Sequence, residues 1–455
     1  MRAELDELAA HLVDGGSVIL AESELDRHGS DFSIHPPHRP DVVVQPATTR
    51  EVAAVVGAAA RLRIPVVPFG SGTSLEGQVI PVEGGISLDL TRLDRVLAVH
   101  AADLSATVQA GVTRRRLDET VREHGLQFPV DPGADATLGG MAATNASGTT
   151  TVRYGGMRRH VLALEAVLGD GRVVRTGSRA RKSSAGYDLT SLLVGSEGTL
   201  AVITELTLRL HPVEETGATV RLEFGDVDAA CAAVVELVAG GVAVTRLELL
   251  DAWNVAAVNR YSGTSLPESP LLLVDLNGPP ASVDADVAAV RDVAADHGAT
   301  GVVVERGESE RRTLWRTRHD AAHAVMATAP GKKPRSTDVC VPVSELPAAV
   351  AEARRAVDAL GIDAGVSGHV ADGNFHVAFM VDPGDPEELE RARRLDEALV
   401  DDALARGGTC SGEHGIGIGK RAYLAREHPD LVPLYAGLKQ VFDPHRILNP
   451  GKVIS

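Results

Sequence analysis

The segment from Pro132 to Gly156 constrains this chain more than any other, because small residues dominate it. The pairs Gly139-Gly140 and Gly155-Gly156 are its clearest marks. Glycine loses more conformational freedom on folding than any other residue, so such a segment is costly unless something large must approach the backbone. A bulky planar cofactor meets that requirement. The sequence therefore favours a cofactor-binding scaffold.

A second glycine-rich segment, Gly70–Ser74, follows an expected strand at Ile64–Phe69. Leu75 stands where the dinucleotide-binding fingerprint requires its third glycine, so a nicotinamide-binding site of that type is not expected. The backbone N–H groups and the hydroxyls of this segment suit a nest around phosphates. A solvated turn remains the alternative interpretation. A third segment, Gly195–Thr199, precedes an expected strand and is a candidate second wall of the same cleft.

The first half of the chain predicts alternating strands and helices. A strand at 42–44 is followed by the capping-box pattern Thr48-Thr49-Arg50-Glu51, which opens a helix reaching about Arg63 and then the strand Ile64–Phe69. This is a β-α-β unit. Further along, 162–176 contains an Asp170-Gly171 hairpin turn, and 200–210 alternates like a half-buried strand. Pro212 closes this part.

From about Val213 the pattern changes to β-α-β-β-α-β, which is the ferredoxin-like order. The expected elements are strands at 220–224, 245–250, 271–276 and 301–305, and helices at 226–239 and 282–297. Helices at 308–326 and 386–406 follow. The predicted fold class is thus α+β, with a cofactor domain at 1–212, an antiparallel-sheet domain at 213–419 and a C-terminal segment, 420–455, that returns to the first domain.

His369 and His376 flank an Asp372-Gly373 pair that is typical of a two-residue hairpin turn. Such a turn places His369 directly opposite His376. Opposed residues have Cβ atoms roughly 4.5–5.5 Å apart, a spacing at which two imidazoles can share a divalent metal. The two histidines require a third ligand, and Glu413-His414 supply candidates later in the chain.

Composition excludes some classes of protein. The formal net charge is −17, from 45 basic and 62 acidic residues, and a nucleic-acid binder would need a basic surface. Three scattered cysteines do not make a disulfide framework and fit a reducing compartment. The N-terminus reads as an acidic amphipathic helix rather than a targeting signal, and no apolar stretch approaches the roughly 20 residues that span a bilayer. We therefore expect a cytoplasmic protein.

Six motifs in chain order together resemble the D-lactate dehydrogenase and glycolate oxidase branch of the vanillyl-alcohol oxidase flavoprotein superfamily. The resemblance covers nearly the whole chain. The motifs are Pro68–Ser74, Asp131–Gly140, Gly195–Thr199, Gly368–His376, Gly412–Gly417 and Asn449–Lys452.

The resemblance implies a two-subdomain FAD-binding domain of the PCMH type, a ferredoxin-like substrate domain, and oxidation of a D-2-hydroxy acid to a 2-oxo acid. It implies a divalent metal, zinc or manganese, held by His369, His376 and Glu413. No histidine or cysteine lies in the loops where a covalent flavin link is expected, so the FAD should be dissociable. The residues expected to bind FAD are Pro68, Gly70, Ser71, Gly72, Thr73, Ser74, Pro132, Gly133, Asp135, Thr137, Gly139, Gly140, Ala143, Asn145, Gly148, Glu197, Gly198, Ile203 and Asn449.

Three further residues are candidates for contacting the substrate. If Glu413 and His414 are extended, their side chains point in opposite directions, so Glu413 can bind metal while His414 acts as the general base. Neutral imidazole suits that role because it titrates near working pH. The planar fork of Arg318 suits a substrate carboxylate, although a solvated basic helix face is its alternative explanation. Asn374 ends the expected hairpin turn.

The preferred substrate follows from a departure from the family pattern. Relatives specific for hydroxyglutarate carry a threonine and a lysine where this chain has Ala322 and Ser336. A second carboxylate would lack its partners here, which favours a small monocarboxylate such as D-lactate. Glycolate dehydrogenase and D-2-hydroxyglutarate dehydrogenase remain alternatives on this scaffold, as does an ether-lipid synthase.

In a different class, a metal-dependent hydrolase would use only His369, His376 and Glu413, and a non-catalytic binding module is the least favoured reading. The expected partners are a small-molecule substrate and an external electron acceptor, either a quinone, a cytochrome or an electron-transfer flavoprotein. Neither nucleic acid nor a transmembrane segment is expected, and a homodimer is possible.

Overall fold

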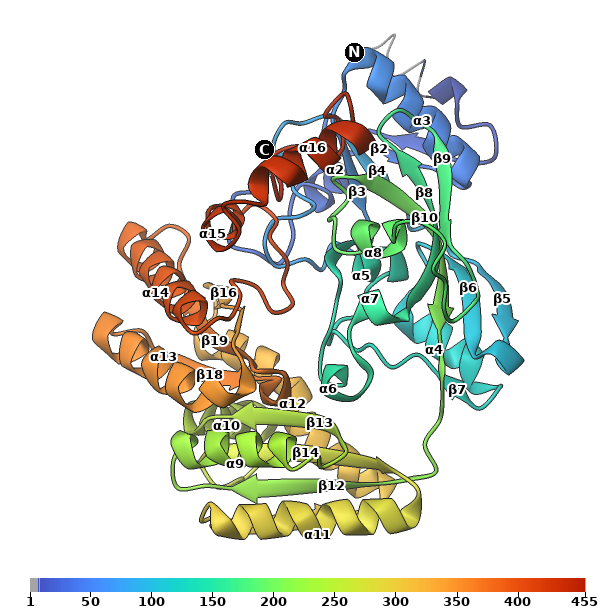
Figure 1. The fold of residues 1–455 in the computed structure, drawn as a ribbon. Helices are drawn as coiled ribbons and strands as arrows, with labels where there is room; N and C mark the ends of the chain where they lie inside the picture. Colours follow the sequence, from blue (N-terminus) through green and yellow to red (C-terminus); the bar gives the residue numbers. More distant parts are fainter. Residues whose placement is uncertain (1–6, 8, 455) are drawn as a thin grey trace. The chain divides into compact units, whose positions relative to one another are not determined.

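The computed structural model describes residue 7 and residues 9–454, in two compact units. The first unit comprises the chain up to Ser147, then Gly155–Val213 and the part from Glu413 onward. The second comprises Gly148–Tyr154 and Glu214–Gly412 (Figure 1). The sequence predicted ranges of 1–212, 213–419 and 420–455. The expected N-terminal helix lies largely outside the described residues.

A small, mostly parallel sheet of the first unit contains the predicted β-α-β unit. Its order is β1 (Ser17–Ile19), β2 (Val42–Gln45), β4 (Ile86–Asp89) and β3 (Val66–Phe69). Helix α3 (Thr49–Leu62) connects β2 to β3, and both strands pair parallel to β4. Thr48 caps α3 by accepting the N–H of Glu51, as the capping pattern predicted.

A larger antiparallel sheet makes the second layer of this unit. Its order is β5 (Val96–His100), β6 (Ser105–Gln109), β10 (Ala201–Arg209), β8 (Val161–Leu168) and β9 (Val173–Gly177). The predicted Asp170-Gly171 turn does connect β8 to β9, with Gly171 at φ +86°. The short strands β7 (Leu126–Gln127) and β11 (His211–Pro212) pair separately.

Short helices surround these sheets in the first unit. They are α2 (Glu22–Arg27), α4 (Arg114–Arg122), α5 (Leu138–Thr144), α7 (Met157–His160), α8 (Leu189–Leu193), α15 (Arg421–Glu427) and α16 (Val432–Phe442), with the 3-10 turn η1 (Ala101–Asp103). The C-terminal residues return to the first sheet, because Val66 donates to the carbonyl of Ile447 and Asn449 donates to that of Val66. The sequence predicted such a return for residues 420–455.

The second unit has the predicted ferredoxin-like order at one end of its sheet. The strands β15 (Gly301–Glu305), β12 (Thr216–Glu223), β14 (Leu271–Gly278) and β13 (Val244–Leu250) lie side by side in that order, each antiparallel to its neighbour. Helices α9 (Val227–Ala239) and α11 (Pro280–Asp296) make the two crossovers. Strand β13 contains one acidic residue, Glu248.

The same sheet continues beyond the ferredoxin-like part through β18 (Ala364–Gly368), β19 (Asn374–Val381) and β16 (Lys333–Ser336), with β17 (Val339–Cys340) paired to β19. A helix that the sequence did not predict, α10 (Ala252–Ser262), lies between β13 and β14. The other elements are α6 (Thr151–Tyr154), α12 (Glu308–Thr328), α13 (Leu346–Leu360), α14 (Pro386–Ala405), η2 (Val343–Glu345) and η3 (Val370–Asp372).

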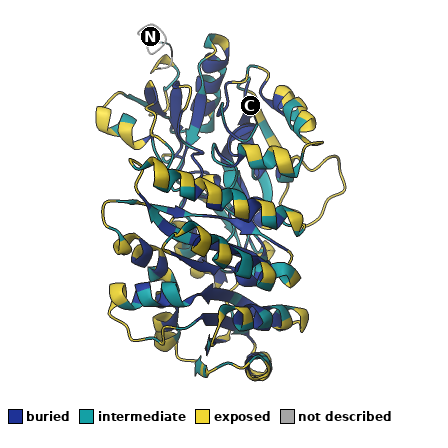
Figure 2. Ribbon diagram, turned by 90° about the vertical axis from the view of Figure 1, so that its left-hand side faces the viewer, coloured by how far each residue is buried: buried dark blue, intermediate teal, exposed yellow. Residues whose placement is uncertain are grey.

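Burial follows helical periodicity in the second unit. In α13 the buried residues are Leu346, Ala349, Val350, Ala353 and Val357, which share one face. Gly361 ends the helix in the left-handed conformation. Figure 2 shows such helices with one exposed side and one buried side. Tertiary packing of that face, more than intrinsic propensity, stabilises each helix.

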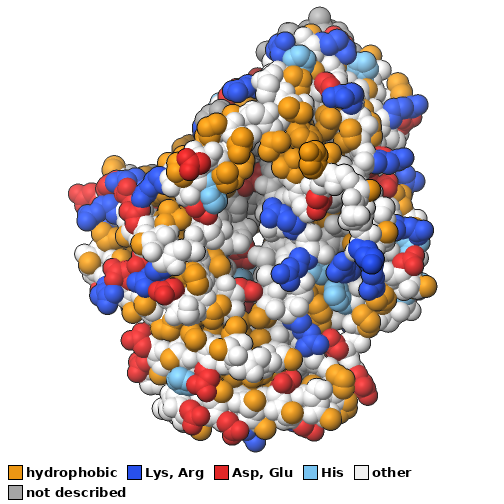
Figure 3. Space-filling model, in the orientation of Figure 1, with side chains coloured by type: hydrophobic (Ala, Val, Ile, Leu, Met, Phe, Trp, Pro, Cys, Tyr) orange, Lys and Arg blue, Asp and Glu red, His pale blue; other side chains and the backbone are white. Residues whose placement is uncertain are grey.

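Helix α16 departs from this rule because its outward side is apolar. Leu434 is 62% exposed and Val441 is 69% exposed, while Lys439 turns inward and donates to Asp443. Figure 3 shows hydrophobic side chains gathered on the surface where α16 lies. Isolated exposed apolar residues are ordinary, but two on one helical face form a small patch.

Burial lowers the pKa of His160 to about 4, and this generates a stability prediction. The unfolded chain binds the proton near pH 6.5 and the folded chain does not, so stability is lost as pH falls through that window. In His160→Gln we expect about 2 kcal/mol of the wild-type loss between pH 7 and pH 5 to disappear.

The measurement is the unfolding free energy from denaturant titration at the two pH values. His124→Gln, at an exposed position, is the matched control and should behave as the wild type does. Equal acid sensitivity in the wild type and His160→Gln would remove buried His160 as the cause.

Candidate active site

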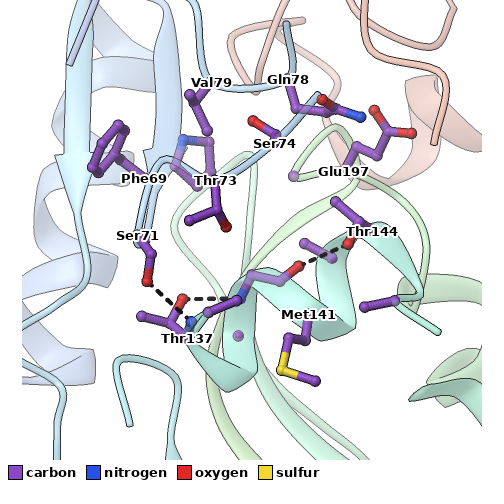
Figure 4. Close-up of a pocket in the computed structure, with 18 of the residues that line it drawn as sticks. Phe69, Ser71, Thr73, Ser74, Gln78, Val79, Thr137, Met141, Thr144 and Glu197 are labelled. Carbon is purple, nitrogen blue, oxygen red and sulfur yellow. Dashed lines mark hydrogen bonds between the residues drawn. The ribbon is translucent and has the colours of Figure 1, made fainter. Parts of the chain in front are cut away.

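A large cleft opens in the first unit between its two sheets (Figure 4). It encloses about 1200 Å³, including space open to solvent. Its walls come from the end of β3 and the following loop, from α5, and from the start of β10.

Close backbone approach shapes these walls. Thr137 caps α5 by accepting the N–H of Gly140, and its own N–H donates to Ser71 Oγ at 3.1 Å. A Cβ at Gly70 would lie 2.3 Å from Thr137 Oγ1. Gly198 has φ +70°, and a Cβ there would lie 3.0 Å from Pro68 Cγ. The small residues are therefore required by the packing of the walls against one another.

Most of the residues predicted to bind the cofactor line this cleft. They are Pro68, Gly70, Ser71, Gly72, Thr73, Ser74, Pro132, Thr137, Gly139, Gly140, Ala143, Glu197, Gly198, Ile203 and Asn449. Their positions bring the segments Pro68–Ser74, Asp131–Gly140 and Gly195–Thr199 together, as their shared composition suggested.

Four predicted residues do not line the cleft. Asp135 pairs with Arg115 at 3.0 Å, and Asn145 ends α5 with φ +52° and accepts the N–H of Arg158. Gly133 has φ +78° with open space around it, and Gly148 belongs to the second unit. Small or polar character alone did not distinguish such turn residues from cleft residues.

The cleft also contains residues that the cofactor prediction did not name. They are Phe69, Leu75, Gln78, Val79, Leu90, Ala110, Ala134, Ala136, Met141, Thr144, Ala146, Ser147, Ala201, Glu413 and His414. The presence of Glu413 and His414 brings the proposed metal ligand and the proposed base to the cofactor cleft. Ser147 Oγ lies 3.5 Å from Glu413 Oε2.

The backbone after His414 is held by the first unit. Gln78 Nε2 donates to the carbonyl of His414 at 2.7 Å. The carboxylate of Glu197 accepts the N–H groups of Ile416 and Gly417 at 2.6 and 2.8 Å. Burial raises the pKa of Glu197 to about 7, and the two amide donors act in the opposite direction. Each oxygen accepts one N–H donor, and the ionised carboxylate can accept at both oxygens.

Glu413 and His414 do not diverge as an extended segment predicts. The chain bends here and forms no strand, and Glu413 Oε1 lies 3.8 Å from His414 Nε2. The expectation of opposite side-chain directions was therefore wrong, because it depended on strand geometry that this segment lacks. Both side chains nevertheless belong to the same wall of the cleft.

The predicted register of the two-histidine hairpin in the second unit was also wrong. His376 pairs with Ser367 of β18, not with His369. The turn is longer than two residues, since η3 occupies Val370–Asp372 and Gly373 follows with φ +77°. His369 therefore lies beyond the end of β18. The two rings still approach, with centroids 5.7 Å apart and planes at 85°.

Each histidine uses one ring nitrogen to bind the protein. His369 Nδ1 lies 2.6 Å from Glu248 Oε1, and His376 Nδ1 lies 2.9 Å from the carbonyl of Thr337. Because both acceptors are oxygens, Nδ1 carries the proton in each ring, and Nε2 is the nitrogen that can bind a metal. Both side chains are buried. In metal sites a second partner orients each imidazole in this way, so these two rings could hold a metal ion.

Glu248 connects His369 to Arg318. Its second oxygen accepts Arg318 Nε at 2.7 Å, and its side chain is fully buried. Burial acts to raise the pKa of Glu248, but the charges and hydrogen bonds of His369 and Arg318 outweigh it and leave the pKa below its usual value. Within the described chain, the terminal nitrogens of Arg318 donate to no protein group, so the outer edge of the guanidinium is available to an anion.

Asn374 is more restricted than the sequence suggested. Its amide nitrogen donates to Asp338 Oδ1 and to the carbonyl of Val339, each at 2.8 Å. Only its carbonyl oxygen is left to accept a hydrogen bond from a substrate. Asp338 also accepts from Ser411 at 2.9 Å, so it joins this turn to the chain that leads to Glu413.

Sequence reasoning missed Glu248, Asp338 and Gln78 as site residues. One signal was present for Glu248, which is an acidic residue inside the apolar strand β13, where an unpaired charge is too costly to bury. Asp338 and Gln78 carried no comparable pattern. Their roles depend on contacts with residues far away in the sequence.

Comparison with known proteins identifies the family. Residues 213–453 match the family of FAD-linked oxidases through its C-terminal domain, and residues 40–177 match an FAD-binding domain. The chain belongs to the FAD-linked oxidases. It is an FAD-linked oxidoreductase, and its FAD-binding domain supplies much of the wall of the cleft in the first unit.

Relatives within this family cover most of the chain. A probable mitochondrial D-lactate dehydrogenase of Danio rerio is 44% identical over 94% of this chain and 87% of its own. A mitochondrial D-lactate dehydrogenase (cytochrome) of Arabidopsis thaliana is 40% identical over 91% and 73%. Glycolate oxidase subunit GlcD of Bacillus subtilis is 34% identical over 91% and 89%. The branch inferred from the six motifs is thereby confirmed.

Solved structures share the fold of this FAD-linked oxidase. p-Cresol methylhydroxylase superposes with a TM-score of 0.83 at 20% identity, over 100% of this chain and 97% of its own. Alkyldihydroxyacetonephosphate synthase gives 0.77 at 20% identity, over 99% and 86%. At such identities only the α+β, PCMH-type fold is shown. No helix among the described residues has the length and apolar character needed to span a membrane.

The shape of the FAD site generates a testable prediction for Gly198→Ala. The substitution places a Cβ 3.0 Å from Pro68 Cγ at φ +70°, so the two walls must move apart. We expect FAD to bind at least tenfold more weakly, as measured by fluorescence titration of the apoprotein.

Gly125→Ala is the matched control, because Gly125 has φ +69° with nothing within 4 Å of the added Cβ. Both variants should lose about 1 kcal/mol of folding stability from the left-handed conformation. Equal FAD affinities in the two variants would show that contact between the walls does not shape the site.

Proposed function

We propose that this FAD-linked oxidase oxidises a D-2-hydroxy acid, with D-lactate preferred, to the corresponding 2-oxo acid, pyruvate, using a divalent metal. Two observations together carry the proposal. Relatives that are 44% and 40% identical are named as D-lactate dehydrogenases. The second unit also holds two oriented histidine rings close together. An external acceptor, either a quinone, a cytochrome or an electron-transfer flavoprotein, would then take the electrons.

The cleft fits dissociable FAD. Backbone and hydroxyl groups of Gly70–Ser74 line it and suit the pyrophosphate, and small residues of α5 and Gly198 leave room for a planar ring. No cysteine or histidine other than His414 is among the residues that line the cleft. His414 is proposed for a different role, which leaves no separate nucleophile for a covalent link.

A metal of the zinc or manganese type fits the donor set. Two buried rings, those of His369 and His376, are oriented through Nδ1, and Nε2 is the atom that each would offer to a metal. A Cβ at Gly412 would lie 2.1 Å from Asn374 Nδ2, so Gly412 packs on the same turn as the histidines. Because successive Cα atoms are about 3.8 Å apart, Glu413 begins one peptide unit from that turn. We propose it as the third ligand.

When bound, the flavin supplies a hydride acceptor and the metal a Lewis acid that acidifies a hydroxyl group. The outer edge of Arg318 binds the substrate carboxylate, held in place by Glu248. His414 accepts the proton of the C2 hydroxyl through its imidazole, and Asn374 offers a carbonyl oxygen. Glu413, 3.8 Å from His414, stabilises the imidazolium that results.

The substrate is proposed to be small and to carry one carboxylate. Ala322 on α12 and Ser336 on β16 stand where hydroxyglutarate-specific relatives carry groups for a second carboxylate. Neither residue carries a positive charge that would bind a second carboxylate. Glycolate and D-2-hydroxyglutarate therefore serve as comparison substrates for D-lactate. We also propose that the protein is cytoplasmic and forms a homodimer. The apolar side of α16 is a candidate surface for the dimer.

The first prediction of this function is stereospecific bleaching of the flavin. Anaerobic addition of D-lactate should bleach the visible flavin absorbance of the FAD-loaded protein, and L-lactate should not. Glycolate and D-2-hydroxyglutarate should reduce it more slowly. A protein that remains fully oxidised with all four acids would contradict the proposed function.

His414→Ala should abolish the bleaching while FAD remains bound, because the hydroxyl proton then has no acceptor. His445→Ala removes a histidine of the same unit that does not line the cleft, and should be reduced at the wild-type rate. Normal reduction of His414→Ala would remove His414 as the base.

The second prediction concerns the metal. In Glu248→Gln the His369 ring loses the anion that fixes its tautomer, and loss of such a partner typically weakens metal binding 10–100-fold. Competition with a chromogenic chelator measures the change. Glu236→Gln is the matched control, since Glu236 lies 2.7 Å from His297 on the surface of the same unit. Unchanged zinc and manganese affinity in Glu248→Gln would contradict the proposed ligand set.

A further inference from the structure

Two residues from distant segments bind the backbone at and after His414, and a third residue binds both of them. Glu197 comes from the segment before β10, Gln78 from the loop after β3, and Asn449 from the C-terminal motif. In Figure 4 the side chains of Gln78 and Glu197 lie together at one end of the cleft. The predicted cofactor role of Glu197 and Asn449 does not explain this convergence.

Both oxygens of the Glu197 carboxylate accept backbone N–H groups, those of residues 416 and 417. Oε1 accepts Ile416 N–H at 2.6 Å, and Oε2 accepts Gly417 N–H at 2.8 Å. A carboxylate facing bound FAD would repel its phosphates, whereas this one faces the protein. Glu197 therefore lines the cleft without offering its charge to the cofactor.

Gln78 and Asn449 complete the arrangement. Gln78 Nε2 donates to the His414 carbonyl at 2.7 Å, and Asn449 Nδ2 donates to the main-chain carbonyls of Gln78 and Glu197 at 3.0 and 2.7 Å. Lys452 Nζ in turn donates to Asn449 Oδ1 at 3.1 Å. Asn449 thus connects the two residues that bind the His414 segment.

The backbone at two of these residues is strained. Glu197 has φ +51° and Asn449 has φ +41°, both in the left-handed region. Asparagine tolerates this region, but glutamate rarely enters it. Such conformations persist where the surrounding contacts over-determine them, and they concentrate at functional sites. Here the strain occurs where the three segments meet.

We propose that Glu197, Gln78 and Asn449 form a clasp that positions Glu413 and His414 at the FAD site. The clasp fixes the backbone on the C-terminal side of His414, and thereby the reach of its imidazole and of the Glu413 carboxylate. This inference rests on the roles proposed above for Glu413 and His414. It assigns Glu197 as a positioning residue.

The structure offers a nearly isosteric test in Glu197→Gln. A glutamine keeps the volume but presents an N–H₂ group to one of the two amide donors, so only one hydrogen bond can form. Glu205→Gln is the matched control, because Glu205 lies on β10 of the same unit and does not line the cleft. Gln78→Ala is the second variant, since it releases the His414 carbonyl and leaves Glu197 intact.

The first measurement is amide hydrogen exchange in peptides covering 412–420 of the FAD-loaded protein. We expect at least tenfold faster exchange at one of the two amides, Ile416 or Gly417, in Glu197→Gln, and wild-type exchange at both in Glu205→Gln. Unchanged exchange in both Glu197→Gln and Gln78→Ala would overturn the clasp. This readout does not depend on activity.

The second measurement is anaerobic flavin reduction by D-lactate. We expect the limiting rate in Glu197→Gln and Gln78→Ala to fall at least tenfold, with the apparent substrate dissociation constant changed less than threefold and FAD affinity unchanged. A wild-type limiting rate despite faster exchange would overturn the positioning role. If the wild-type protein is not reduced by any 2-hydroxy acid, the proposed function fails, and the exchange result alone decides whether the clasp holds the segment.

Discussion

The orientation of His369 and Arg318 in the second unit depends on their hydrogen bonds to the buried carboxylate of Glu248. A charge removed from water is stable only when it is paired and fully hydrogen-bonded, and here His369 and Arg318 each take one oxygen. Removing any one of the three leaves an uncompensated group in the interior. The carboxylate therefore fixes a ring and a guanidinium together, and neither orientation can change independently.

Glu197 serves the first unit in a related but distinct way. Its charge is compensated by two backbone N–H groups, whereas that of Glu248 is compensated by a guanidinium and an imidazole. Backbone donors cannot carry a full opposite charge, which is consistent with a raised pKa at Glu197 and a lowered one at Glu248. One glutamate thus orients side chains, and the other orients the chain itself.

Much of the fold could be predicted because local chemistry determines it. The capping pattern at Thr48 fixed the start of α3, the Asp170-Gly171 turn fixed the β8–β9 hairpin, and periodicity gave the ferredoxin-like strand order. Helix α10 was missed because its 11 residues have a weakly amphipathic pattern between two strong strands. In the site, the motif residues were found, but Gln78 and Glu248 act through partners 336 and 121 positions away, which no local pattern encodes.

The error in the histidine hairpin shows what actually places the two rings. A direct cross-strand pair would have been positioned by the sheet, and only His376 is. His369 lies beyond the last paired residue of β18, with φ −83° and ψ +66°, where the ladder no longer constrains it. Its hydrogen bond to Glu248 then restrains its ring. Since Glu248 lies on β13, a strand that pairs with β18, the sheet places the His369 ring through a side chain rather than through the hairpin.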